Sequence, residues 1–509
     1  MALRCPNLLS RCAGSYQTIG LFLGPVAFVL TLMLPRAEGL SEVGQGVLAT
    51  TLWTAIWWMT EAIPINAASF LPFLLFPFLG VMDATDAARA GMNDSIYLFA
   101  GGFFLAAALE RWGFHRRMAL ATLITFGNRP QRLILGVMSV VAFLSFWLTN
   151  TATVVMMLPI LVAVVNEARR KLGDSPECAR FASALLLGTA LAANIGGMGT
   201  PVGTVPNAVM IGQLAKQGIE ISFLTWMAHA VPVVIVLIPL CFLLLVNVTA
   251  RVPRDLTIGD QDSLRQDRLA LGAWTPAEKR LAMIFGFTVV LWITRQDVVL
   301  SEDLRIPGWA SFLETLGLIP QGAGKGIRDG SVSVLAALLL FSIPSGIGKD
   351  RLLDWDHASR VPWGVLFLLA GGFILAEGFT VGGDRSLGSY LGAQLEGLRE
   401  IPLFWQLLGI TLVVSFLTEF ASNTATCTLL IPLIIALFAP TGLEYLPHCF
   451  AVALGASCSF MMPVATPPNA LVFSTGLIPI GRMVRNGLLL NVTSAVVVAS
   501  ILWAIASFF

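Results

Sequence analysis

Four short clusters of Asn, Thr, Ser, Gly and Pro interrupt the apolar stretches of this sequence. They lie at 149–151, 196–207, 422–424 and 463–469. Proline and glycine break a helix and free backbone carbonyl and amide groups. Freed carbonyls favour a hard cation such as sodium, whereas the N–H groups at the start of a half-helix favour an anion. The four clusters contain no Lys, Arg or His, so an anion bound there must be neutralised by helix ends and by bound cations.

The composition of the chain places these clusters in lipid. Of the 509 residues, 56% are hydrophobic and 12% are charged, and the mean hydropathy is +0.81. Soluble domains carry about 25% charged residues, so a soluble enzyme is excluded. The net charge of +1 provides no field that would attract nucleic acid. We therefore expect a polytopic protein of the lipid bilayer with no nucleic-acid partner.

Two of the clusters lie at the centre of apolar windows of unusual length. One crossing of the bilayer takes roughly 20 residues, and the windows at 133–165 and 402–439 are too long for one crossing and too short for two. Each predicts a re-entrant hairpin with a polar tip. The clusters at 196–207 and 463–469 interrupt apolar windows and predict broken helices. Pairing across helix contacts would also satisfy such polar groups, but their coincidence with breaks in both halves favours a ligand site.

The clusters belong to a duplicated pattern. A-G-G-F at 100 recurs at 370, T-N-T-A-T at 149 recurs as S-N-T-A-T at 422, and P-V-G-T-V-P-N-A at 201 recurs as P-V-A-T-P-P-N-A at 463. Three matches in one order, at an offset of about 270 residues, indicate a repeated unit. An odd number of crossings in the first copy would place the second copy upside down, which is typical of transporters.

This pattern divides the chain into four expected parts. They are an N-terminal segment with a first span at 1–43, a first repeat at 44–248 with a hairpin at 131–166, a cytoplasmic loop at 249–278, and a second repeat at 279–509 with a hairpin at 402–439.

The distribution of positive charge predicts the orientation of the chain. Most of the 31 Lys and Arg residues fall on the inside when the N-terminus is cytoplasmic and the C-terminus is outside. The first hairpin then opens from the cytoplasm and the second from outside. Short loops suggest a bacterial inner-membrane protein.

Three carboxylates near the apolar windows have two readings. Glu61, Glu377 and Glu419 could carry a proton or a cation, but a capped helix-end carboxylate explains each of them equally well. We therefore leave them outside the predicted site.

The sequence resembles the divalent-anion:sodium symporter family, which includes the INDY-type dicarboxylate transporters. The resemblance lies in the paired hairpin motifs, in G-G-M-G-T-P at 196 and in C-S-F-M-M-P-V-A-T-P-P-N-A at 458. The resemblance covers roughly residues 45 to 508. It implies an all-α membrane fold with inverted repeats, about eleven transmembrane helices and two re-entrant hairpins. It also implies a homodimer, an elevator motion of a transport domain against a scaffold, and sodium-driven uptake of succinate, malate, fumarate or a related di- or tricarboxylate. Sodium would be the coupling ion at two or more sites, with no other cofactor and no enzymatic activity.

The resemblance also implies the residues of the binding site. The first sodium site would use Ser145, Thr149, Asn150 and the backbone at Gly199, with Gly203 as the alternative that internal symmetry selects. The second would use Thr418, Ala421, Asn423 and Ala465. Substrate carboxylates would meet Asn150 with Thr151 and Asn423 with Thr424, closed by Thr466 and Pro467.

Two departures from the family pattern leave the substrate open. The first hairpin carries T-N-T where S-N-T is usual, and Val205 stands where a second proline is expected. A sodium-independent dicarboxylate exchanger and a sulfate or tartrate transporter remain alternatives. A channel is disfavoured because hairpins and inverted repeats build alternating access, and a membrane enzyme because no catalytic constellation falls in the broken helices.

Overall fold

The computed structural model describes residues 9–126, 129–253, 269, 271–299, 305–394, 396–438 and 444–508. This part of the chain is helical except for a ribbon of two strands with two residues each, β1 (Val298–Val299) and β2 (Arg305–Ile306). The predicted all-α class is thereby confirmed. Parts of the predicted 1–43 and 249–278 segments fall outside the described residues.

The first half of the chain forms the helices up to α12 and a short π-helical end. Their bounds are α1 Leu9–Met33, α2 Glu42–Thr60, α3 Ile65–Ala68, α4 Leu71–Phe78, α5 Ala84–Gly91, α6 Asp94–Arg111, α7 Phe114–Phe126, α8 Pro130–Ser145, α9 Asn150–Leu172, α10 Pro176–Gly197, α11 Val205–Lys216, α12 Phe223–Leu243 and η1 Leu244–Thr249.

The second half repeats this order with shorter pieces between. Its bounds are α14 Pro276–Ile293, α15 Trp309–Thr315, η2 Ala323–Gly326, α16 Asp329–Ser342, α17 Trp355–Ala358, α18 Trp363–Gly378, η3 Gly383–Arg385, α19 Leu387–Gln394, η4 Glu396–Glu400, α20 Leu403–Leu417, α21 Asn423–Phe438, α22 Leu446–Ala456, α23 Pro467–Ser474 and α24 Ile480–Phe508.

Among the described residues, five helices are long and apolar enough to cross a membrane alone, and the pair α5 and α6, bent by 46°, would make a sixth. Shorter apolar helices have 10–17 residues, and those at 130–145, 403–417 and 423–438 flank the polar hairpin tips. Capping side chains fix where many helices begin: Ser41 caps α2, Ser222 caps α12, and Thr275 forms a capping box with Glu278 on α14.

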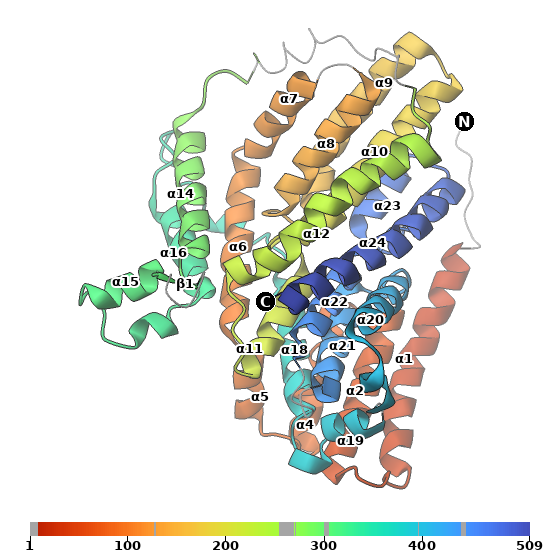
Figure 1. Cartoon of the computed structure of the whole chain (residues 1–509), viewed down its shortest axis with the longest axis vertical. Coiled ribbons are helices and arrows are strands. Elements are labelled where there is room, and N and C mark those ends of the chain that lie inside the picture. Colours follow the sequence, from red (N-terminus) through yellow and green to blue (C-terminus); the bar gives the residue numbers. More distant parts are fainter. Residues whose placement is uncertain are drawn as a thin grey trace.

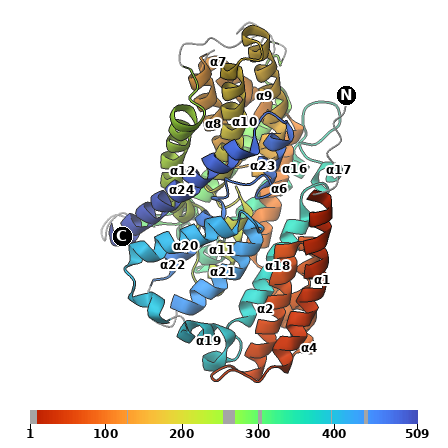
Figure 2. The same ribbon diagram turned by 90° about the vertical axis from the view of Figure 1, so that its right-hand side faces the viewer.

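The helices are arranged so that the two predicted hairpins lie in opposite halves of the long axis (Figures 1 and 2). The pair α8 and α9 lies with α7 at one end, and α20 and α21 lie toward the end that carries α19 and α4. The first hairpin has a second arm that runs to Leu172, beyond the predicted end at 166. The second, from Leu403 to Phe438, nearly matches the predicted range of 402–439.

The duplicated A-G-G-F motif packs in the same way in both copies. A methyl group on Gly101 of α6 would lie 2.5 Å from Cβ of Ser333 on α16, and one on Gly371 of α18 would lie 2.1 Å from the carbonyl oxygen of Ser69 beside α3. Each copy thus requires glycine where it approaches a serine of the other copy.

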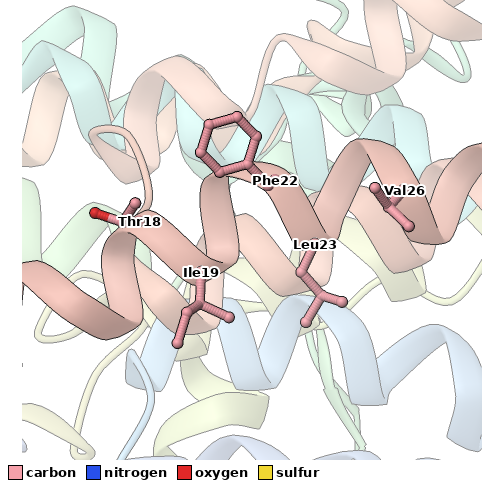
Figure 3. A pocket seen from close by; sticks show the side chains of 5 residues that line it. All are labelled: Thr18, Ile19, Phe22, Leu23 and Val26. Carbon is pink, nitrogen blue, oxygen red and sulfur yellow. The ribbon is translucent and has the colours of Figure 1, made fainter.

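The helix α1 lies at one edge of the molecule in both views (Figures 1 and 2). Only 11% of its apolar window is buried, against 89% for α10. Ile19, Phe22, Leu23 and Val26 line a shallow apolar hollow on its outer face (Figure 3). Such a face suits contact with lipid chains.

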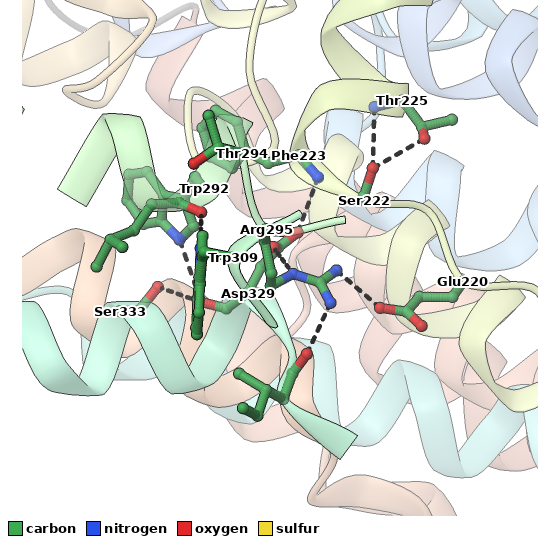
Figure 4. A network of polar contacts seen from close by, with 12 residues as sticks. Glu220, Ser222, Phe223, Thr225, Trp292, Thr294, Arg295, Trp309, Asp329 and Ser333 are labelled. Carbon is green, nitrogen blue, oxygen red and sulfur yellow. Dashed lines mark hydrogen bonds and ion pairs between the residues drawn. The ribbon is translucent and has the colours of Figure 1, made fainter. Parts of the chain in front are cut away.

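A buried ion-pair network joins the start of α12, the end of α14 and the start of α16 (Figure 4). Arg295 Nε lies 2.6 Å from Asp329 Oδ1, and Arg295 Nη2 lies 2.8 Å from Glu220 Oε1. Asp329 Oδ2 accepts a 2.8 Å hydrogen bond from the backbone N–H of Phe223. The side chains of Arg295 and Asp329 are 3% and 6% exposed, so each charge depends on the other for its compensation.

Candidate binding site at the hairpin tips and broken helices

Each half-helix that follows a break crosses to the hairpin of the other copy. The helix α11 packs against α21, and α23 packs against α9, while α10 contacts both arms of the first hairpin. The polar clusters of the two copies are therefore brought together inside the bundle, although they are far apart in the sequence.

The first hairpin tip brings three oxygen-bearing groups together. The Ser145 hydroxyl lies 2.7 Å from Asn150 Oδ1 and 2.8 Å from the carbonyl oxygen of Ala193. Thr149 caps α9 by accepting a hydrogen bond from the N–H of Ala152. Ser145 is fully buried. These neutral oxygens form a cluster of the kind that holds a sodium ion.

The backbone of Gly203, rather than that of Gly199, lies next to this cluster. A Cβ atom on Gly203 would lie 2.4 Å from the carbonyl oxygen of Gly197 and 2.9 Å from that of Ser145. A Cβ atom on Gly199 would instead meet the ring of Phe146 at 2.5 Å. Of the two predicted alternatives, Gly203 is therefore the one whose added Cβ would approach the backbone of Ser145.

The second hairpin tip is similar but not identical. Asn423 Oδ1 accepts a 3.2 Å hydrogen bond from the Ser459 hydroxyl. Thr418, fully buried, donates to the carbonyl oxygen of Ser415 in its own helix at 3.0 Å, whereas Ser145 reaches across to α10. Ala421 lies buried in the turn before α21, and the Ala465 N–H donates to the carbonyl oxygen of Met462 at 3.2 Å.

Three of the predicted substrate residues lie at the start of a helix. Thr151, Thr424 and Pro467 each lie in the first turn of a helix, α9, α21 and α23 respectively. The first backbone N–H groups of α9 and α21 lack intrahelical partners, so these two helix starts offer donors and a positive dipole end to an anion. At the start of α23, Pro467 and Pro468 have no N–H and the Asn469 N–H donates to Thr466 Oγ1, so this helix offers its dipole alone.

Two asparagines stabilise the backbone of the broken helices. They belong to the repeated motifs but were not part of the predicted site. Asn207 Nδ2 donates to the carbonyl oxygens of Gly197 at 3.0 Å and Thr200 at 2.7 Å. Asn469 Nδ2 donates to those of Ser459 at 3.2 Å and Met462 at 3.1 Å. The recurrence of P-N-A in both copies is the sequence signal for this shared role.

Asn194 joins the two copies, and sequence reasoning missed it. Its Oδ1 accepts a 3.4 Å hydrogen bond from Asn150 Nδ2, and its Nδ2 lies 3.1 Å from Thr466 Oγ1 and 3.4 Å from Asn469 Oδ1. The side chain is 1% exposed. Asn194 therefore links the first hairpin tip to the second broken helix. The equivalent position in the second copy is an alanine, Ala456, so the duplication gives no signal for it.

Glu419 follows the end of α20 and is capped by neighbouring donors, which is the second of the two interpretations given above. Its Oε1 accepts hydrogen bonds from the backbone N–H groups of Phe460 and Met461 at 2.7 and 2.8 Å and from Asn491 Nδ2 at 2.8 Å. Its Oε2 accepts from the Met462 N–H at 2.8 Å. This fully buried carboxylate holds the segment that follows α22 against the second hairpin.

Among the described residues no group of three or more His, Cys, Asp or Glu side chains could hold a metal ion. A cation at the hairpin tips would accordingly be held by hydroxyl, amide and backbone oxygens. Such ligands suit sodium and carry no net charge that would repel an anion.

Known transport proteins match almost the whole of this chain. The family model described as sodium:sulfate symporter transmembrane region matches residues 16–508. The chain belongs to the sodium:sulfate symporter family. The resemblance to the divalent-anion:sodium symporters is thereby confirmed.

Relatives within this family match over nearly their whole length. The sodium-dependent dicarboxylate transporter SdcS of Staphylococcus saprophyticus is 39% identical over 96% of this chain and 91% of its own. That of Staphylococcus aureus strain USA300 is 36% identical over the same shares. The solved YdaH transporter of Alcanivorax borkumensis covers 90% of this chain and 98% of its own at a TM-score of 0.54 and 14% identity. This structural likeness supports the helical transporter fold.

Proposed function

We propose that this family member is a secondary active transporter, not an enzyme, that couples sodium to the symport of succinate, malate, fumarate or a related di- or tricarboxylate. The observation that supports this proposal most directly is the cluster of neutral oxygens at the first hairpin tip, which Asn194 links to Thr466 of the other copy. The two SdcS relatives are named as sodium-dependent dicarboxylate transporters.

Sodium binding prepares the anion site in this proposal. A cation at the first tip would take oxygens from Ser145, Asn150 and the backbone around Gly203, and one at the second tip would take them from Thr418, Ala421, Asn423 and Ala465. Each bound cation adds a positive charge beside a helix start. A substrate carboxylate meets a hydroxyl, an asparagine amide and backbone N–H groups at each tip, with Thr466 and Pro467 closing the site. The cations offset the charge of the dianion, because no basic side chain lies in the four clusters.

The assembly and placement in the membrane follow the same proposal. We assign the protein to the cell inner membrane as a homodimer, with the N-terminus in the cytoplasm and the C-terminus outside. The first repeat spans 44–248 and the second 279–509, and the two hairpins open from opposite sides. A transport domain that carries both hairpins moves as an elevator against the remaining helices.

Uptake of labelled succinate into proteoliposomes tests this function. An inward sodium gradient should drive accumulation, and replacing sodium by potassium should abolish it. Asn150→Ala and Asn423→Ala should each lose uptake, whereas Asn247→Ala, an exposed control, should retain it. Full uptake in both site variants would overturn the site. Transport that ignores sodium and needs internal dicarboxylate would assign an exchanger, and sodium-driven uptake of sulfate or tartrate alone would change the substrate.

A further inference from the structure

A cavity of about 440 Å³ leads to the first hairpin tip from one side of the molecule. It is enclosed by α6, by the hairpin turn and by the segment between α17 and α18. Its lining residues are Phe103, Ala106, Ala107, Glu110, Arg111, Leu148, Thr149, Ala152, His357, Arg360, Val361 and Pro362. Thr149 is the cap of α9 and precedes Asn150 directly, so the cavity ends where the proposed site begins.

The cavity lining carries two arginines and a histidine against a single carboxylate, that of Glu110. This contrasts with the hairpin tips, which have no basic side chain. The helix starts at the tips do not attract a dianion over long distances, because helix-end effects fall off within a turn. Full charges act over about 10 Å at 0.1 M salt, so they can gather a dianion before it reaches the tip.

Arg111 is held in the cavity wall by acidic partners behind it. Its Nη1 lies 2.7 Å from Asp354 Oδ2 and its Nη2 lies 3.5 Å from Asp350 Oδ2, and its side chain is 12% exposed. Asp354 Oδ1 also lies 2.7 Å from His357 Nδ1. Asp354 therefore offsets much of the charge of Arg111 and orients His357.

The charge of Arg360 is not offset by an ion pair with any described residue. Its side chain is exposed and lines the cavity. We infer that Arg360 forms a capture site for the substrate dianion at the mouth of this cavity, one step before the hairpin tip. In the proposed orientation this mouth faces the cytoplasm. The inference rests on the proposed function only in taking a dianion as substrate.

Sided transport kinetics test the capture site. Succinate KM is measured separately at the cytoplasmic and the outer face, in inside-out and right-side-out vesicles. Arg360→Ala should raise the cytoplasmic KM about tenfold, within the range that steering supplies, and leave the outer KM within twofold. Arg360→Lys should recover most of the loss. Lys349→Ala removes an exposed positive charge from the connection between α16 and α17, which precedes the segment that carries Arg360. It is the matched control and should change neither KM.

Salt provides a second readout that a folding defect does not imitate. Raising the ionic strength with choline chloride at constant sodium should raise the cytoplasmic KM of the wild type and change that of Arg360→Ala much less. An Arg360→Ala protein with the KM values of Lys349→Ala, or with equal increases at both faces, would overturn the capture site. The wild type is measured first. If it does not transport succinate, the proposed substrate is wrong, and the variants are then compared with whichever dianion the wild type carries. Transport of no dianion would overturn both the proposed function and the capture site.

Discussion

Replacing Gly203 by alanine tests how the first cation site is built. A Cβ atom there would lie 2.4 Å from the carbonyl oxygen of Gly197 and 2.9 Å from that of Ser145. Real Cβ atoms essentially never come within 3.0 Å of a heavy atom. Both contacted atoms belong to the backbone and cannot rotate away. The hairpin turn or the break after α10 must therefore move, and with it the oxygens proposed to hold sodium.

The size of the effect follows from the cost of overpacking. Inserting a methyl group into a packed interior costs about 1–3 kcal/mol, and each 1.4 kcal/mol is a factor of ten in affinity. If the strain falls on the sodium-bound state, the sodium concentration for half-maximal uptake should rise about 5-fold to 150-fold. The expected loss is smaller for Gly199→Ala, because the added Cβ would meet the Phe146 ring, a side chain that can turn.

Sodium activation of succinate uptake, measured at saturating succinate, gives the required constant. Gly409→Ala on α20 is the matched control, because nothing lies within 4 Å of its added Cβ. That variant should keep the wild-type sodium constant and gain slightly in thermal stability, since alanine favours a helix. A sodium constant for Gly203→Ala within twofold of the Gly409→Ala value would refute the placement of Gly203 beside the cation.

Four further perturbations address other contacts. Asn194→Ala should weaken succinate binding and lower stability by about 1–3 kcal/mol, because its buried partners lose their hydrogen bonds; unchanged binding in calorimetry would remove Asn194 from the site. Glu419→Ala leaves the backbone N–H groups of Met461 and Met462 without their acceptor, while that of Phe460 keeps Asn491 Oδ1; it should cost at least about 2 kcal/mol, visible as a large drop in Tm in detergent, and a Tm near the wild-type value would contradict this role of Glu419. Arg295→Met should cost about 3–5 kcal/mol because it strands Asp329, and adding Asp329→Leu should recover part of that; additive losses in the double variant would argue against direct coupling. Hydrogen bonds from His357, helped by the nearby Arg111, lower the pKa of Asp354 from 3.8 to about 2. The stabilising contribution of the Asp354 carboxylate is therefore complete above pH 3.8 and is lost as the pH falls toward 2. Asp354→Asn should flatten the pH dependence of Tm in this range, and a profile identical to that of the wild type would disprove the contribution of Asp354.

The periodicity and composition of the sequence were enough for the fold class. The scarcity of charge required lipid as the solvent, and the windows around T-N-T and S-N-T were too long for one span, which predicted two helices joined by a turn. The structure has such pairs at α8 with α9 and α20 with α21. These conclusions depend on local chain properties, which a sequence carries directly.

The composition of the site was only partly accessible from the sequence. Duplication pointed to both hairpin tips and both broken helices and selected Gly203, whereas the family resemblance implied Gly199; neither pointed to Asn194. Thr418 stands at the position that corresponds to Ser145 in the second copy, yet its hydroxyl bonds within its own helix, whereas that of Ser145 reaches α10. A repeat predicts equivalent positions, but it does not predict which side chains at those positions meet.

The sequence by itself determined that this chain is a membrane protein, that its motifs are duplicated, and that its four polar clusters lack basic side chains. Tertiary structure alone decided that α11 crosses to the second hairpin and α23 to the first, that Gly203 lies against two carbonyl oxygens, and that Arg360 lines a cavity ending at Thr149. The physical reason is range. Hydropathy and helix breaking act between residues near in sequence, whereas an ion site is a set of distances between atoms that only the packing of distant helices brings together.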